Sequence, residues 1–305
     1  MTWGPIVVGV DLSPEAKGAA VVAERLGRLA NVPCHVVHAM RDAWAPLVAV
    51  SVDPQVVDMQ QLQLAVARHH LNELLGTSVS DQVLRKVDVV FGPAAVVLQQ
   101  VMREKRPGLV VLGGKHHSVL DRWLGGSTSL HMVRAAEVPV LITAGTPPAF
   151  RRVLVAADLS KAAGPTLGLA ERFARLVGAE LRVLTVFEPL PDMPAMSPVD
   201  PTEYFALAQD TLQREIWPLV KTPTVEKLVR HGTVVDTLLR EATDWKADVL
   251  VIGSHGKGWG QRVLLGSVTE QLINHLPTSL LVAPVGVAAA KLEKREKRQP
   301  AVAAR

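Results

Sequence analysis

The chain repeats itself over a length that suits a whole domain and is too long for a solenoid repeat. Residues 6–13 read IVVGVDLS and residues 153–160 read VLVAADLS, a shift of 147 positions. Further along, LVVLGG at 109–114 corresponds to VLVIGS at 249–254, where the shift is 140. Self-similarity at a nearly fixed spacing constrains the fold more than any other pattern in the sequence, and it predicts two similar domains.

Each half alternates short apolar runs with longer segments of helical spacing. Such an alternation favours parallel strand pairing with right-handed crossovers. We therefore predict an α/β fold of two tandem doubly wound, five-stranded parallel sheets (Rossmann-like), with the first and fourth strands of each half side by side. The predicted strands are 6–10, 35–39, 86–90, 109–112 and 139–142, then 153–157, 181–186, 225–229, 249–252 and 279–283.

The segments between the strands set the predicted domain bounds. The glycine and prolines of AGTPPAF at 144–150 interrupt the pattern, so we predict domains at 1–145 and 150–286, followed by a basic flexible tail at 287–305. Residues 41–56 and 188–202 are expected to be long excursions over the strand ends. Helices are predicted to follow them at 57–75 and 203–220, and Pro218 must end or kink the second.

Composition and charge exclude several classes of protein. The net charge of +4 falls entirely in residues 291–305, with six basic and two acidic side chains. The rest of the chain is neutral, so it gives no global electrostatic case for nucleic acid binding. Cys34 is the only cysteine, so no intramolecular disulfide is expected. Because no signal peptide or long apolar run is found, we expect a cytoplasmic protein that does not insert into a membrane.

A glycine motif in the second half carries the most chemical information. Gly253 and Gly256 follow the predicted strand 249–252, and after nine residues Gly266-Ser267 precedes a segment of helical spacing. Ligands of open parallel sheets bind beyond the carboxyl ends of the strands. Glycines there let backbone N–H groups approach an anion, and a helix N-terminus adds unpaired donors. The motif therefore suits a phosphate-binding loop, although a glycine-rich surface turn remains an open alternative.

The motif differs from two common nucleotide loops. No Gly-Lys-Ser/Thr follows, as a Walker loop would require, and Gln261 occupies the last position of a dinucleotide fingerprint. The spacing Gly253, Gly256, Gly266-Ser267 instead resembles that of ATP-binding members of the universal stress protein family. The words VLVIGSHGKG and LLGSVTEQLI, and the first strand ending in Asp158-Leu-Ser, resemble the family too. The likeness covers about residues 5–143 and 151–284.

The resemblance implies a site and a ligand, namely ATP or another adenine nucleotide with Mg²⁺ as a candidate companion. Asp158 would lie near the ribose, with a turn or helix-capping aspartate as the alternative, and Val186 would offer its backbone to the adenine edge. The remaining implied residues would bind ribose and phosphates: Gly253, Gly256, Gly266, Ser267 and Val268. A fold like that of the adenine nucleotide alpha hydrolases is also implied.

The first half departs from this pattern, most importantly at the second glycine. Asp11, Gly113, Gly126 and Ser127 correspond to the second-half residues, and Ala39 takes the place of Val186. His116, however, replaces the second glycine, which puts an imidazole where the backbone would meet a ligand. We therefore expect the nucleotide mainly in the second domain and a weaker or empty site in the first.

Other chemistry finds little support in the sequence. The ten histidines include no HExxH pair and no Cys-x-x-Cys accompanies them, so no metal site is predicted. Cys34 opens a strand and is expected to be a small buried residue rather than a nucleophile. No Gly-x-Ser-x-Gly elbow occurs, and no catalytic residue is predicted. Metal ligands and a base for phosphoryl transfer are not identifiable, so at most slow ATP hydrolysis is expected.

The leading hypothesis is a nucleotide-binding regulatory protein of the stress response. Two alternatives stay open: a nucleotide-free interaction module acting through its surfaces, and a slow ATP hydrolase. The resemblance also implies that the two halves pair about a pseudo-twofold axis through the last strand of each, which would cover sheet edges. A homodimer and an unknown protein partner are open as well. The sequence names neither the stress signal nor the role of the basic tail.

Overall fold

The chain forms two α/β units. The computed structural model describes residues 3–40, 54–114, 128–147, 149–188, 201–254, 265–275 and 278–284. Contacts divide the chain into a first unit, Met1–Ala136 with Val140–Pro147, and a second unit, Glu137–Pro139 with Pro148–Arg305. Most of the predicted excursions 41–56 and 188–202, namely residues 41–53 and 189–200, and the predicted tail at 287–305 lie outside the described residues.

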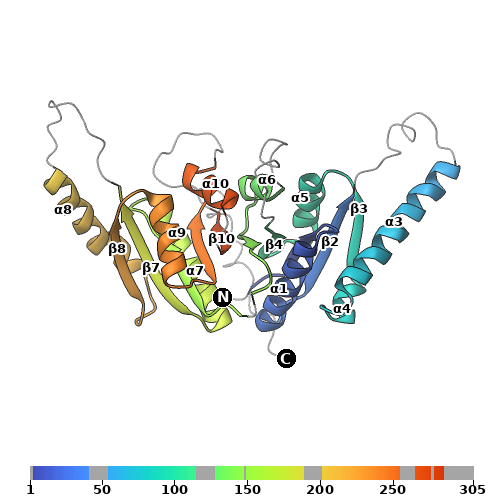
Figure 1. Cartoon of the computed structure of the whole chain (residues 1–305), viewed down its shortest axis with the longest axis horizontal. Coiled ribbons are helices and arrows are strands. Elements are labelled where there is room, and N and C mark those ends of the chain that lie inside the picture. Colours follow the sequence, from blue (N-terminus) through green and yellow to red (C-terminus); the bar gives the residue numbers. More distant parts are fainter. Residues whose placement is uncertain are drawn as a thin grey trace. The chain divides into compact units, whose positions relative to one another are not determined.

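The first unit contains a parallel sheet in the order β3-β2-β1-β4-β5. Its helix α1 packs on β1 and β4 and contacts α3, whereas α5 packs on β2 and contacts α6 (Figure 1). The strands are β1 (Ile6–Val10), β2 (Cys34–Met40), β3 (Val87–Phe91), β4 (Leu109–Gly113) and β5 (Val140–Thr143). The helices are α1 (Pro14–Ala30), α3 (Pro54–Leu75), α4 (Asp81–Leu84), α5 (Ala94–Lys105) and α6 (Thr128–Ala135).

The second unit repeats this arrangement, with the order β8-β7-β6-β9-β10. Helix α7 packs on β6 and β9, and α9 packs on β7 and contacts α10. The strands are β6 (Arg152–Ala156), β7 (Glu180–Phe187), β8 (Glu226–His231), β9 (Val249–Gly253) and β10 (Ser279–Ala283). The helices are α7 (Ala163–Val177), α8 (Pro201–Thr211), α9 (Val234–Asp244) and α10 (Ser267–Asn274).

The predicted architecture is confirmed in both units. Every pairing within each sheet is parallel, and the first and fourth strands are neighbours, with Val8 opposite Val111 and Val155 opposite Val251. All ten predicted strands are present within two residues of their predicted bounds. The central strands are buried runs of Val, Leu and Ile, as expected for a parallel sheet covered on both faces. Among the described helices, none is long and apolar enough to cross a bilayer.

Two glutamates at matched positions are buried in the repeat. Glu24 of α1 accepts hydrogen bonds from the Ser80 backbone N–H at 3.2 Å, shortly before β3. Glu171 of α7, 147 positions later, accepts the backbone N–H groups of Lys221 and Thr222 at 2.7 and 2.6 Å, shortly before β8. A buried carboxylate must be hydrogen bonded to offset its lost hydration. Each unit therefore uses the same internal tether to hold the segment that enters its third strand.

Backbone conformations also repeat between the units. Gly92 and Gly232, which are 140 positions apart like the fourth strands, both have φ of +142° in the turn between the third strand and the next helix. A side chain rarely tolerates such a φ, which explains why glycine occupies both positions. The helices α1 and α7 likewise end at the matched residues Asn31 and Gly178 in the left-handed region, with φ of 52° and 67°.

Two local predictions need correction. The helix predicted over 203–220 ends at Thr211 and continues as a π-helical turn, Leu212–Ile216, and a 3₁₀ turn, Trp217–Leu219. Pro218 has no N–H to donate to the preceding turn, so the chain changes its hydrogen-bond pattern around it. The sequence Ser13-Pro14 is also typical of a helix start with a capping serine. Ser13 occupies the N-cap of α1, but its hydroxyl donates to the carboxylate of Asp11 and makes no capping bond to the helix.

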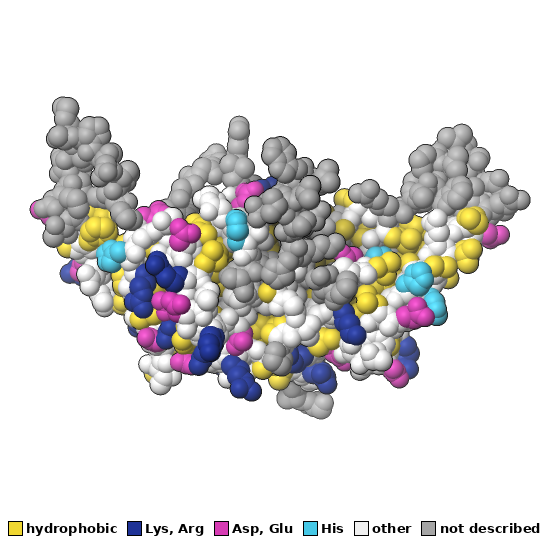
Figure 2. All heavy atoms as spheres, viewed as in Figure 1, with side chains coloured by type: hydrophobic (Ala, Val, Ile, Leu, Met, Phe, Trp, Pro, Cys, Tyr) yellow, Lys and Arg dark blue, Asp and Glu magenta, His cyan; other side chains and the backbone are white. Residues whose placement is uncertain are grey.

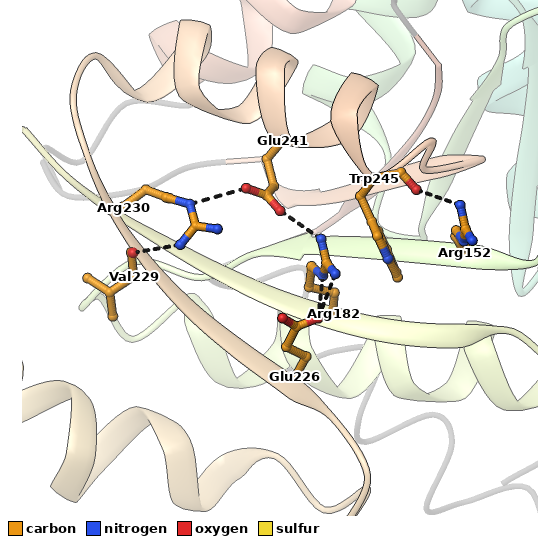
Figure 3. A network of polar contacts seen from close by, with 7 residues as sticks. All are labelled: Arg152, Arg182, Glu226, Val229, Arg230, Glu241 and Trp245. Carbon is orange, nitrogen blue, oxygen red and sulfur yellow. Dashed lines mark hydrogen bonds and ion pairs between the residues drawn. The ribbon is translucent and has the colours of Figure 1, made fainter.

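A polar network joins the exposed edge of the second sheet to the helix above it (Figure 3). The Arg182 guanidinium contacts Glu226 of β8 at 2.6 Å and Glu241 of α9 at 2.7 Å. It also lies 4.3 Å from the ring centroid of Trp245. Arg230 contacts the other oxygen of Glu241 at 3.2 Å. Since β7, β8 and α9 all contribute, Arg182 ties the edge strand and the helix to the same point.

We predict that Arg182→Ala lowers the free energy of unfolding by about 2–3 kcal/mol, because it leaves the Glu241 carboxylate, 12% exposed, with fewer charged partners. Arg182→Lys should recover only part of the loss, since an ammonium neither bridges both carboxylates nor stacks on Trp245 as a guanidinium does. Urea denaturation followed by circular dichroism measures the change.

The matched control is Glu226→Ala. Its carboxylate is 50% exposed, so removing it should cost less than about 1 kcal/mol. Equal losses for the Arg182 and Glu226 variants would contradict a central role for Arg182.

Cys34 is the buried strand residue that the sequence predicts. It begins β2 and is 8% exposed. Burial, together with the nearby Glu24 carboxylate, raises the pKa of the thiol to about 12. The reactive thiolate is therefore scarce near neutral pH.

Cys34 should accordingly react with iodoacetamide at pH 8 at least about a hundred-fold more slowly in the folded protein than in guanidinium chloride, because both burial and the raised pKa limit attack. Mass spectrometry of the labelled chain follows the reaction. Comparable rates in the two solvents would show that the first unit opens readily around β2.

Candidate functional site

A cavity of about 420 Å³ opens at the carboxyl ends of the second unit's strands. It is lined from β6, β7 and β9, and from helices α7, α8, α9 and α10. This volume is within the range of small-molecule sites. Of the seven second-half residues predicted to bind a nucleotide, six line the cavity: Asp158, Val186, Gly253, Gly266, Ser267 and Val268. The seventh, Gly256, lies outside the described residues.

One side of the cavity is apolar and aromatic. Val186 and Phe187 end β7, and Tyr204 of α8 lines the same side. Val234 and Leu238 approach from α9. Thr185 forms part of the floor, where its hydroxyl donates to the Ala157 carbonyl at 2.9 Å and holds the ends of β6 and β7 together. A planar apolar group is the kind of ligand that such a wall accommodates.

The opposite side of the cavity is built from a helix N-terminus. Gly266 is the N-cap of α10 with an extended backbone, and no side chain caps this helix. The first N–H groups of a helix have no partner within it, so those of Ser267, Val268 and Thr269 are available to an acceptor in the cavity. The same end of the helix is the positive end of its dipole. This side therefore suits an anion.

Hydrogen bonds join the end of β9 to the start of α10 at this edge. Ser254 donates its N–H to the Ala283 carbonyl at 2.9 Å, and Gly266 donates its N–H to the Ser254 carbonyl at 3.0 Å. The Thr269 hydroxyl donates to the Gly253 carbonyl at 2.9 Å. Ser254 and Gly266 thus lie at neighbouring points beside the end of β9, next to the cavity-lining residues Gly253 and Ser267.

Asp158 forms the turn that the sequence left as one of its alternatives, and it lies at the cavity as well. Its Oδ1 accepts the N–H and the hydroxyl of Ser160 at 3.1 and 2.6 Å, and the Ser160 hydroxyl in turn accepts the Ala162 N–H at 3.1 Å. This arrangement is a local turn that leads into α7. Asp158 also lines the cavity. One carboxylate oxygen can therefore hold the turn while the other serves a ligand hydroxyl.

The charges around the cavity are unevenly placed. Two carboxylates line it, those of Asp158 and Glu188, and no Lys or Arg does so among the residues that the structure describes. Glu188 accepts the Val234 N–H at 3.4 Å and thereby places its negative charge at the N-terminus of α9. Since α9 already faces a carboxylate, the N-terminus of α10 is the more favourable of the two for a phosphate.

In the first unit, three of the five predicted positions are described. Asp11 accepts the Ser13 N–H at 3.0 Å, the same turn as at Asp158. Ala39 precedes the last residue of β2, and Gly113 ends β4. Gly126 and Ser127 lie outside the described residues, as does His116.

The structure adds a difference between the units that the sequence analysis missed. His38 stands where Thr185 stands in the second unit, and its Nδ1 lies 2.8 Å from the Val10 carbonyl. Because that oxygen can only accept, the imidazole proton lies on Nδ1. His38 is buried, so the first unit places an imidazole where the second has a small hydroxyl. Applying the shift of 147 to residue 38 would have revealed this substitution.

Among the described residues, no group of three or more His, Cys, Asp or Glu side chains is placed to hold a metal ion. The cavity-lining residues Tyr204, Glu188, Val234 and Leu238 were also not predicted. Glu188 directly follows β7, which is a signal that the strand assignment could have supplied. Tyr204 of α8 and Val234 and Leu238 of α9 line the cavity because of how these helices pack, which the sequence pattern does not specify.

Comparison with known proteins agrees with this architecture. The model of the universal stress protein family matches residues 2–144 and again residues 149–284. A universal stress protein of Mycolicibacterium smegmatis is 28% identical over 290 residues, which cover 91% of this chain and 96% of the relative.

Solved structures include a universal stress protein from Archaeoglobus fulgidus, which is 20% identical with a TM-score of 0.62 and covers 94% of this chain and 98% of its own. A universal stress protein in complex with cAMP is 25% identical with a TM-score of 0.32 and covers 44% of this chain and 97% of its own. Because the family model matches both halves, the chain belongs to the universal stress protein family and carries its domain twice in tandem.

Proposed function

We propose that this chain is an adenine-nucleotide-binding regulatory protein of the stress response, with ATP or a related nucleotide held in the cavity of the second unit. The observation that carries the proposal is the convergence on one cavity of six residues from positions 158 to 268. Occupancy would act as a signal by changing how the tandem domains meet a partner. Turnover of the nucleotide is not required for this role.

The two sides of the cavity fit the two ends of a nucleotide. The apolar side formed by Val186, Phe187 and Tyr204 suits the base. The phosphates would accept hydrogen bonds from the α10 N-terminus and the backbone of the glycine motif. Asp158 follows β6, which lies between β7 and β9 in the sheet, and it would accept a hydrogen bond from a ribose hydroxyl. Mg²⁺ would accompany the phosphates, as it commonly does, retaining most of its ligands from phosphate and water.

We predict that the purified protein binds about one adenine nucleotide per chain, because Gly256 of the second motif corresponds to His116 in the first. Calorimetric titration with ATP measures the stoichiometry, and nucleotide released from the denatured protein gives a second count. Two equal sites per chain would contradict the asymmetry. No binding of ATP, ADP or AMP would favour the interaction-module hypothesis instead.

Gly256→Val should weaken ATP binding about ten-fold or more, because the added side chain keeps the phosphate from backbone N–H groups that make charge-assisted hydrogen bonds. The melting temperature should stay unchanged, since the motif follows the strand end and is not part of the core. The matched control is His116→Val at the corresponding position of the first domain, which should leave ATP affinity as in the parent. If Gly256→Val bound ATP like the parent, the glycine motif would not be the site.

A further inference from the structure

An aromatic cluster lies beside the cavity of the second unit. It consists of Tyr204 and Phe205 of α8, Phe187 at the end of β7 and His231 at the end of β8. Figure 2 shows hydrophobic side chains at the surface over α8, where Leu207 is largely exposed. Aromatic side chains are scarce in this chain, at 4% of residues, so such a concentration at the rim of a cavity calls for an explanation.

Phe205 acts as the packing centre of the cluster. Its ring meets His231 edge-on at 5.2 Å between centroids and Phe187 at 6.2 Å in a tilted arrangement. It also meets Tyr204 edge-on at 5.6 Å. Edge-to-face contacts of this kind restrict the rings that make them. Phe205 therefore fixes α8 to the ends of β7 and β8, and it holds the neighbouring Tyr204 in place.

Tyr204 is the member of the cluster that α8 presents to the cavity. It lines the cavity together with Phe187, whereas Phe205 does not. Its side chain is only partly buried, so one part of the ring packs on Phe205 and the rest is open to a ligand. A tyrosine ring has few rotatable bonds and loses little entropy when it binds a flat partner.

We infer that Tyr204 stacks on the base of the bound nucleotide and thereby selects ligands that carry a planar base over sugar phosphates without one. This inference rests on the proposed function and adds a specificity-determining residue to it. Aromatic rings stack on every nucleobase, because each base has a π face. The aromatic side chain would act from α8, outside the glycine motif and the strand ends.

The first domain has no aromatic residues at the positions that correspond to Tyr204 and Phe205. Helices α3 and α8 both begin at a proline, Pro54 and Pro201, which are 147 positions apart like the first strands. By this shift Val57 corresponds to Tyr204 and Asp58 to Phe205. Met40 corresponds to Phe187 in the same way. Base stacking is thus a property of the second domain, in keeping with a single main site.

The chain offers a direct probe, because Tyr204 is its only tyrosine. Protein produced with 3-fluorotyrosine should give one ¹⁹F resonance, which reports on this ring alone. We expect ATP and adenosine to shift the resonance, because both place a base against the ring. Tripolyphosphate and ribose 5-phosphate should leave it unshifted at concentrations that compete with ATP. Equal shifts with ribose 5-phosphate and adenosine would overturn the inference.

Substitutions of Tyr204 in the full chain test how much its ring contributes to nucleotide affinity. Tyr204→Leu keeps an apolar side chain but removes the ring, and it should weaken the binding of both adenosine and ATP about ten-fold. Tyr204→Phe keeps the ring and should bind both within about two-fold of the parent. The melting temperature of each variant shows whether the fold is intact.

The outcomes separate the two proposals. If the parent binds one ATP but Tyr204→Leu binds it equally well and the ¹⁹F resonance does not move, Tyr204 does not contact the base, and the proposed function stands. If the parent binds no nucleotide at all, the proposed function and the inference both fail. Weaker ATP binding with unchanged adenosine binding would place Tyr204 near the phosphates and would also overturn the inference.

Discussion

The direction in which the chain crosses its own sheet determines where the second unit can bind a ligand. From β6 the chain proceeds to β7 and β8 on one side, and then it returns past β6 to place β9 and β10 on the other. Successive crossovers therefore diverge between β6 and β9, and the carboxyl ends of these two strands stay uncovered. The cavity lies at this point, with Ala157 and Asp158 after β6 and Ile252 and Gly253 of β9 in its lining.

Comparison of the two units distinguishes residues that both domains use to hold the fold from residues that differ at the strand ends. The fold keeps the same devices in both: the buried glutamates Glu24 and Glu171, and the glycines Gly92 and Gly232 with φ of +142°. Each of these holds a turn or a strand entry that the parallel sheet cannot do without. At the cavity floor the units differ, because His38 replaces Thr185 while bonding the corresponding carbonyl. The interaction that joins the strand ends is retained, whereas the side chain that makes it changes from a small hydroxyl to an imidazole.

Strand positions and sheet order could be predicted from the sequence for two reasons. Buried parallel strands are continuous apolar runs, and each run occurs at matching positions in both halves of the chain. The strand-end residues Asp158 and Gly253, which line the cavity, were instead singled out by the resemblance to the universal stress protein family. That Tyr204 and Leu238 line the cavity could not be predicted, because their positions depend on how α8 and α9 pack over distant strands. The break of α8 at Thr211 was also missed, since Pro218 predicts a disturbance but not how many residues before it the helix changes.

The charges around the cavity would favour one orientation of the proposed nucleotide. A phosphate near α9 would meet the Glu188 carboxylate, which already accepts the Val234 N–H. A phosphate near α10 would meet the first N–H groups of that helix, which have no partner inside the helix, and the N-cap Gly266 brings no side chain. The base of the proposed nucleotide would then lie toward Val186, Phe187 and Tyr204, which offer it an apolar surface. Repulsion at one helix end and attraction at the other thus select the same orientation, and neither requires a base-specific hydrogen bond.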